Sequence, residues 1–273
     1  MNRVVKLALF FLAATSISRG AVQGSPHARV ELLARQDAAK PGADLLLGVH
    51  FILEPGWHIY WINPGDSGQP PTFKWQLPPG FTVGEIQWPR PERMQPNKQL
   101  ADYGYHDEVL LPVTLHVLPG FNNRTLAEVR VDAKWLICRE VCIAEHAQLE
   151  LSLPVAATAK ENLQSVPLFA KTEKLLPKPM PRVWKATAKS TKDGFVLALV
   201  TGKPMSKAEF FPLDPGQIDN PAPQKVQPSA TGLHIILKKS DLLLKPITVL
   251  RGVLVIPAGP AYRIDAPVQE SIE

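Results

Sequence analysis

The two cysteines of the chain, Cys138 and Cys142, are the residues whose type and spacing could do chemistry by themselves. They are the only cysteines in 273 residues, and three residues separate them. Such a pair can stabilise a fold as a disulfide, hold a metal ion, or exchange thiol and disulfide with another protein. The compartment, the length of the closed loop and the available ligands distinguish these possibilities.

The N-terminus indicates an oxidising compartment. Arg3 and Lys6 precede a short apolar run, residues 7–14, and small residues follow it, as in a secretory signal. The run is much shorter than the ~20 apolar residues that span a bilayer. We therefore expect residues 1–24 to be cleaved and the chain not to span a membrane. The sequence looks bacterial, so we expect the mature protein in the periplasm, where a disulfide can persist.

The spacing of the pair favours chemistry over reinforcement. For a closed loop as short as that from Cys138 to Cys142, the chain-entropy model gives roughly 2 kcal/mol, against about 4.7 kcal/mol for a hundred-residue loop. The pairing of the two flanking strands already holds the ends of the turn together, so the stabilisation by the disulfide is at most this value. A redox role is therefore the preferred interpretation, and an inert disulfide is the alternative.

A metal site is a weaker interpretation. Structural zinc takes four ligands, and although His146 follows Cys142 by four residues, the sequence has no C-x-x-C and no H-x-x-x-H. Two thiolates could still bind Cu(I). We expect no resident metal and no cofactor, and we keep a non-enzymatic binding module that handles copper as the alternative function. The C-x-x-x-C spacing in a strand context also differs from a thioredoxin centre, whose C-x-x-C opens a helix.

The elements that position the pair are predicted to be strands. The 28 prolines, roughly twice the usual ~5%, argue against a helical protein. Short segments of alternating or continuous apolar residues predict an antiparallel sandwich. The formal net charge is +5, without a concentrated basic stripe, so no nucleic-acid partner is expected. The predicted strands are residues 28–36, 43–53, 108–118, 127–137 and 147–155, then 194–202, 207–213, 232–239 and 247–257.

Composition divides the chain into two domains. Residues 156–182 hold one predicted helix, about 160–176 and interrupted near Pro167, and end in a proline-rich tail. We interpret this segment as a linker between a first domain, residues 25–155, and a second β-rich domain, residues 183–273. Both cysteines and five of the six tryptophans precede the linker, so the first domain is the predicted site of function.

Three motifs in order resemble the N-terminal periplasmic domain of the thiol:disulfide interchange protein DsbD, and its ScsB-type relatives most closely. They are "GWHIYWINPGDSGQPP" at residues 56–71, "YGYHDEVLLPVTL" at 103–115 and "VDAKWLICREVCIAEHAQLELSLPV" at 131–155. The resemblance covers residues 28–155. Less specifically, the second half is similar to the β domain that follows in ScsB-type proteins. The resemblance implies an all-β fold, an immunoglobulin-like antiparallel sandwich followed by a second, smaller β domain.

The resemblance also implies a function. Cys138 and Cys142 match the redox pair of the family, and Cys142 matches the cysteine that forms mixed disulfides with partners. The implied partners are thioredoxin-like periplasmic oxidoreductases and a membrane electron transporter. Because no membrane helices follow in this sequence, we expect that transporter to be a separate protein, and the direction of electron flow stays open. The family's associated processes are cytochrome c biogenesis and copper tolerance.

The same resemblance suggests supporting residues. His58 and Tyr60 occupy the positions of two polar aromatic residues beside the pair, and a cap loop should correspond to residues 94–103. His58 could accept a proton or stabilise a thiolate, since the ordinary pKa of histidine is ~6.5. We add Asp102, Tyr103 and Tyr105 as candidates in and after this loop. The alternatives are a satisfied polar residue for His58 and ordinary turn residues for the other three.

We predict that loss of the disulfide leaves the fold intact. The Cys138→Ser/Cys142→Ser double variant should lose at most about 2 kcal/mol, because the closed loop is so short. Thermal melts of the oxidised wild type and of the double variant measure the difference. Collapse of the fold in the double variant would establish a structural disulfide instead.

Overall fold

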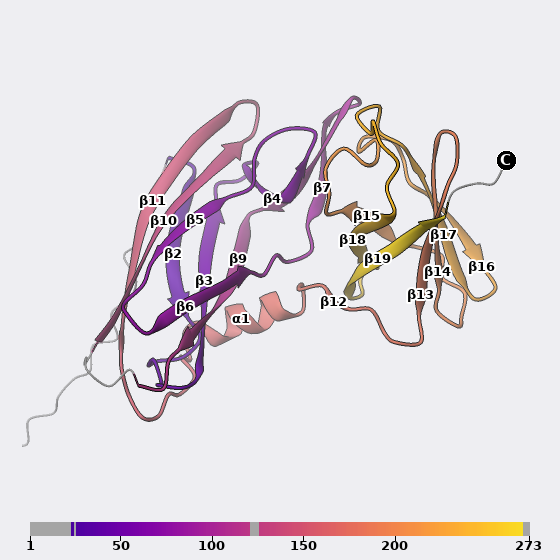
Figure 1. Ribbon diagram of the computed structural model, residues 1–273. Helices are drawn as coiled ribbons and strands as arrows, with labels where there is room; N and C mark the ends of the chain where they lie inside the picture. The colour runs from indigo at the N-terminus through magenta and orange to yellow at the C-terminus, as the bar shows by residue number, and fades with distance from the viewer. Residues whose placement is uncertain (1–22, 25, 121–125, 270–273) are drawn as a thin grey trace, which may run out of the picture.

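The computed structural model describes residues 23–24, 26–120 and 126–269 and shows a chain built almost entirely of strands (Figure 1). In its first half, two antiparallel sheets pack face to face. One sheet has the order β1-β2-β3-β9-β6 and the other the order β11-β10-β4-β8-β7, with β5 paired to β10. Their bounds are β1 Gln23–Gly24, β2 Ala28–Ala34, β3 Asp44–Leu53, β4 His58–Gly65, β5 Thr72–Gln76, β6 Phe81–Ile86, β7 Glu92–Asn97, β8 Leu100–His106, β9 Glu108–Val117, β10 Leu126–Cys138 and β11 Cys142–Pro154.

The longest hairpin of the sandwich carries the cysteines. Strands β10 and β11 pair without interruption from Leu126 opposite Pro154 to Cys138 opposite Cys142. Alternate residues of both strands are buried in the core between the sheets, as the period-two pattern predicted. Cys138 therefore ends one strand and Cys142 begins the next, with the turn between them at the rim of the sandwich.

A third sheet follows in the C-terminal half. Its order is β15-β18-β19-β13-β14-β17-β16, and β12 pairs with β19. It has a buried cluster of its own, which includes Phe195, Leu197 and Ile235. The predicted fold class, an immunoglobulin-like sandwich followed by a smaller β domain, is confirmed. The bounds are β12 Lys178–Pro179, β13 Lys185–Ser190, β14 Gly194–Val200, β15 Glu209–Pro212, β16 Lys225–Ser229, β17 Gly232–Lys238, β18 Val249–Val255 and β19 Ala261–Gln269.

The segment between the halves differs from the expected helix of residues 160–176. Helix α1 (Val166–Glu173) is shorter, and Pro167 lies in its first turn. Proline is tolerated there because the first backbone N–H groups of a helix have no partner within it, so Pro167 starts the helix instead of interrupting it. Phe169 is buried and Lys171 pairs with Glu108 of β9, which holds α1 against the sandwich. The domain boundaries themselves stay a prediction.

The C-terminal sheet also packs against the sandwich. Figure 1 shows β15 and β18 at the edge that faces β7. Phe211, Val253 and Ala261 belong to the buried cluster of the sandwich, and the Phe211 ring meets the edges of Trp61 and Tyr103 at centroid distances of 6.4 and 5.2 Å. The two halves therefore share buried apolar surface.

Pro112 lies inside the predicted strand 108–118, where a proline favours an edge position or a bulge. The edge interpretation is wrong, because β9 lies between β3 and β6. The register of β6 on β9 shifts between Val83 and Ile86, next to Pro112. A residue without an N–H cannot complete the ladder, so the irregularity falls where the proline requires it.

The expected signal sequence lies outside the described residues, apart from Gln23 and Gly24 in β1. In the part of the chain that the structure describes, no helix combines the length and the hydropathy of a membrane span.

Candidate functional site

The two cysteines form a disulfide across the turn of the β10–β11 hairpin. Their Cα atoms are 4.2 Å apart. Cys138 is 2% exposed, whereas Cys142 is exposed, as is Val141 beside it in the turn. The two cysteines therefore differ in access. A partner thiol arriving from solvent meets Cys142, and Cys138 lies behind it.

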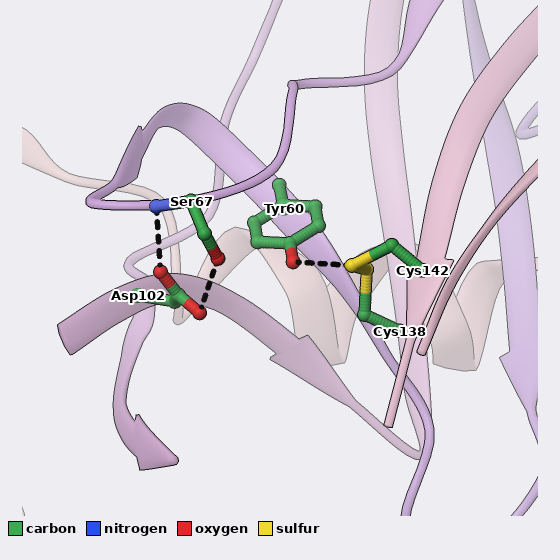
Figure 2. The surroundings of a disulfide bond; sticks show 5 residues. All are labelled: Tyr60, Ser67, Asp102, Cys138 and Cys142. Atoms are coloured by element: carbon green, nitrogen blue, oxygen red, sulfur yellow. Dashed lines mark hydrogen bonds between the residues drawn. A yellow bond between two sulfur atoms is a disulfide. The ribbon is translucent and has the colours of Figure 1, made fainter. Parts of the chain in front are cut away.

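Strand β4 brings the first aromatic residues to the disulfide. Cys138 pairs with His58, and His58 pairs with His106 of β8. Residues directly opposite each other on adjacent strands point to the same face, so these side chains share the face that looks away from the sandwich core. Tyr60, two residues along β4, lies on that face too. Its hydroxyl is 3.5 Å from Cys142 Sγ (Figure 2).

The loop between β4 and β5 covers the Tyr60 ring. Gly68 has φ +73°, and a Cβ added there would stand 2.1 Å from the ring carbon that bears the hydroxyl, so this close approach requires glycine. The Ser67 backbone N–H and hydroxyl donate to the two carboxylate oxygens of Asp102, at 2.9 and 2.8 Å (Figure 2). Asp102 thus reaches the disulfide indirectly, by holding the loop that covers Tyr60.

The Tyr60 hydroxyl is protonated at neutral pH, and burial favours this form further. The pKa of Tyr60 is raised, first by burial and further by the negative charge of Asp102, while a hydrogen bond with Ser67 lowers it. The pKa of Asp102 is raised mainly by burial, against which its bonds from Ser67 act. A neutral phenol beside Sγ can donate a hydrogen bond to a thiolate, which stabilises the charged form of the sulfur.

The surroundings of His58 favour its neutral form. Burial, and secondly the neighbouring His106, lower the pKa of His58 to about 4. Its ring lies edge-on to Tyr60 and to His106, with centroid distances of 5.3 and 5.6 Å. Its Nε2 is buried and has no hydrogen-bond partner among the described residues. Near pH 7 His58 is therefore neutral, and its supporting role in the exchange stays a prediction.

Tyr103 and Tyr105 are not brought to the disulfide. They alternate with Asp102 and His106 along β8 and therefore face the core, where both are buried. The Tyr105 hydroxyl donates to the Pro89 carbonyl at 2.8 Å, and the Tyr103 hydroxyl donates to Asn220 Oδ1 at 3.0 Å. Burial raises the pKa of both phenols well above the usual value.

The expected cap loop, residues 94–103, is instead the end of the β7–β8 hairpin. Gln95 at this end donates to the Pro221 carbonyl of the C-terminal half. The segment that lies over Tyr60 is the β4–β5 loop with Ser67 and Gly68.

Sequence reasoning missed His106, Ser67 and the surroundings of Trp57. The Trp57 indole stacks on His27 at a centroid distance of 3.8 Å, and the Arg139 guanidinium lies 5.2 Å from its centre. His106 could have been found from the period-two alternation of a strand, because residues 102, 104 and 106 then lie on one face and His106 lies on the same face as Asp102. Ser67 lies in a loop and offered no periodic signal.

Comparison with known proteins finds a similarity to one protein family in the first half of the chain. Residues 29–154 match the family model described as thiol:disulfide interchange protein DsbD, N-terminal. This match confirms the resemblance predicted for residues 28–155 and supports a thiol:disulfide exchange module with a cysteine pair. A search of curated proteins gave no match.

Among the solved structures that match, one is similar to the chain over nearly its whole length. It is the crystal structure of the N-terminal periplasmic domain of ScsB from Proteus mirabilis, with a TM-score of 0.70 and 17% sequence identity. The likeness covers 93% of this chain and 100% of the other. At this identity it establishes the fold, and it does so for both halves together.

We predict that His58 makes the protein acid-sensitive. Its pKa is about 4 when folded and ordinary, near 6.5, when unfolded. Between these values the unfolded chain binds more protons, so the free energy of unfolding falls as pH drops from about 6.5 towards about 4. Thermal melts near pH 7, 5.5 and 4.5 should show a smaller acid loss for His58→Gln than for wild type. The exposed His116, paired with Asp44, supplies the control His116→Gln. Equal acid losses in wild type and His58→Gln would contradict the assignment.

A second prediction concerns the Tyr60 hydroxyl. In a Cys138→Ser background, Cys142 is the sole thiol, and Tyr60→Phe removes the hydroxyl beside it. We expect the pKa of that thiol to rise by about one unit, since a hydrogen bond to a charged group contributes roughly 1.5–3 kcal/mol when buried and less when exposed. The pH dependence of alkylation by iodoacetamide measures this pKa. Tyr105→Phe, whose hydroxyl bonds Pro89 instead, is the matched control; identical profiles for Tyr60→Phe and this control would refute the contact.

Proposed function

We propose, from the match of residues 29–154 to the DsbD N-terminal family, that the chain relays electrons by thiol–disulfide exchange through Cys138 and Cys142. The electrons pass from a membrane transporter or thioredoxin-like donor to oxidised client proteins. The observation that supports this function most directly is the unequal access of the pair. Cys142 is exposed at a hairpin turn with a phenol against its sulfur, and Cys138 is buried behind it.

The reductive half of the exchange has two steps. In the reduced protein, the Cys142 thiolate attacks one sulfur of a client disulfide, a mixed disulfide forms, and the other client sulfur leaves as a thiolate. Cys138 then loses its proton and attacks Cys142 Sγ, which restores the Cys138–Cys142 bond and releases the second client thiolate. Two electrons pass to the client, and its two sulfurs take up two protons.

The oxidised pair is regenerated by the reverse chemistry. A dithiol of the donor attacks the disulfide at exposed Cys142, and the second donor thiol resolves the mixed disulfide. Tyr60 contributes in both directions, because Cys142 must exist as a thiolate whenever it attacks or leaves. Its phenol, which is protonated at neutral pH, is placed to donate to that thiolate.

The proposed compartment is the periplasm, after cleavage of a signal within residues 1–24. The similar ScsB structure is titled as a periplasmic domain, and an oxidising compartment is where such a pair cycles. Thioredoxin-like oxidoreductases are the proposed partners. Roles in cytochrome c biogenesis or copper tolerance stay predictions from the family resemblance.

The alternative function is a binding module that handles copper with an otherwise inert disulfide. In the described part of the chain, no group of three or more His, Cys, Asp or Glu residues is arranged to hold a metal ion. Two thiolates suffice for Cu(I), so a Cu(I) titration of the reduced protein, beside a measurement of the pair's reduction potential, separates the two functions.

We predict that Cys142 forms the intermolecular disulfide. Cys138→Ser removes the resolving thiol and should accumulate mixed disulfides at Cys142 when incubated with a periplasmic extract. Cys142→Ser should trap several-fold less, because Cys138 is 2% exposed. Non-reducing gels, with dithiothreitol-treated lanes as controls, measure the adducts.

Two outcomes would change the proposal. More adduct with Cys142→Ser than with Cys138→Ser reverses the assignment of attacking and resolving sulfurs. If neither variant traps a protein from several extracts, the relay is rejected and the copper-handling module is favoured.

A further inference from the structure

The loop that covers Tyr60 is held from the C-terminal half of the chain. Asp66, at the start of this loop, accepts a hydrogen bond from the Ala101 N–H through Oδ2 and one from Asn220 Nδ2 through Oδ1, both at 2.8 Å. Ala101 belongs to β8, whereas Asn220 lies 154 residues along the chain from Asp66. The carboxylate therefore joins the active-site loop to both halves.

Asn220 is itself fixed in position. Its side chain is 6% exposed, and its Oδ1 accepts the hydroxyl hydrogen of Tyr103 at 3.0 Å. The guanidinium of Arg93 donates to the carbonyls of Asn220 and Ala222. Because the amide uses its oxygen for Tyr103, its nitrogen is directed at Asp66. Asn220 and Tyr103 are buried, whereas Asp66 lies at the surface. The bonds of the Asn220 side chain therefore specify one orientation of its amide.

A second contact fixes the same stretch of chain. Asn63, buried in β4, donates to the Pro212 carbonyl of β15 at 2.8 Å and accepts the Gly65 N–H at 3.1 Å. The end of β4 thus contacts the C-terminal half at Asn63, and the loop contacts it again three residues later at Asp66. Beyond Asp66 come Ser67, which bonds Asp102, and Gly68, which lies on the Tyr60 ring.

We propose that Asn220 is a positioning residue of the exchange site. It acts through Asp66 on the β4–β5 loop, and the loop sets the Tyr60 hydroxyl against Cys142 Sγ. The inference rests on the proposed function, since it gives the C-terminal half a part in the chemistry of the cysteine pair. Without the Asn220 amide, Asp66 loses one of its anchors, and the loop no longer holds the phenol in line with the sulfur.

The test compares thiol pKa values in a double-mutant cycle. All proteins carry Cys138→Ser, so that iodoacetamide reports Cys142 alone across a pH series. Asn220→Ala should raise the midpoint of the profile by about as much as Tyr60→Phe, which corresponds to about a tenfold slower reaction below the midpoint for each pKa unit. Combining Asn220→Ala with Tyr60→Phe should move the midpoint no further, because residues that act through one contact are non-additive.

Further variants separate positioning from loss of fold. Asn220→Asp keeps the size and the acceptor for Tyr103 but sets a second carboxylate against Asp66, so its shift should be at least as large. Tyr103→Phe removes the other bond of Asn220 and should shift the midpoint less. Arg90→Ala removes a bond between the halves, to the Gly259 carbonyl, that does not reach the loop, and should leave the midpoint unchanged. Thermal melts of every variant confirm folding.

The outcomes are decisive. An unchanged midpoint in both folded Asn220 variants overturns the proposal, as do shifts of Asn220→Ala and Tyr60→Phe that add in the combined variant. If Arg90→Ala shifts the midpoint by the same amount, the cause is a general loosening between the halves, and the proposal is overturned as well. The alkylation assay needs no partner protein. A negative result in this assay therefore rejects only the role of Asn220, whereas a failure to trap partners rejects the proposed function.

Discussion

The register that places Cys138 opposite His58, and His58 opposite His106, is the constraint on which the site depends. Strand side chains alternate between two faces, so this single alignment decides what can reach the disulfide. It sends Tyr60 and Asp102 to the outer face of the sheet and sends the tyrosines of β8 into the core. A slip of one residue between β4 and β8 would exchange the two sets.

The same alternation explains how far the sequence could predict the structure. Strands β2, β3, β9, β10 and β11 were predicted within a few residues, apart from the start of β11, because long apolar or alternating runs identify them. The first part of strand β8 fell within the cap loop that the family resemblance implied for residues 94–103. The sequence "LADYGYH" is short and contains glycine, so it gave no strand signal against that interpretation. Of the candidates chosen in this segment, Asp102 borders the site. Tyr103 and Tyr105 were chosen for their residue type, but they alternate with Asp102 and therefore face the core. The same alternation would have indicated His106.

Contacts between the halves could not be predicted from the sequence at all. Asp66 and Asn220 are loop residues in segments that share no periodic pattern, and only the packing of β15 beside the sandwich brings them together. The apolar contacts between the halves could not be predicted either. The sequence pattern indicates Phe211 as a core residue of its own sheet, but its ring packs against Trp61 and Tyr103 of the first half. A proline-rich segment between two domains suggests a free tether, yet here buried polar and apolar contacts fix one domain on the other.

The electrostatics of the site bear on how strongly the reduced form of the pair is stabilised. A thiol pair becomes oxidising when its thiolate is strongly stabilised, typically by a cation or a helix N-terminus. Here the pair lies in a strand hairpin, His58 is neutral, and Arg139 lies over the Trp57 ring. The contact that the structure places on Cys142 Sγ is a neutral phenol, whose hydrogen bond stabilises a thiolate less than a full positive charge does. The reduced form therefore gains modest stabilisation from its surroundings, and the reduction potential of the pair is the quantity that reports it.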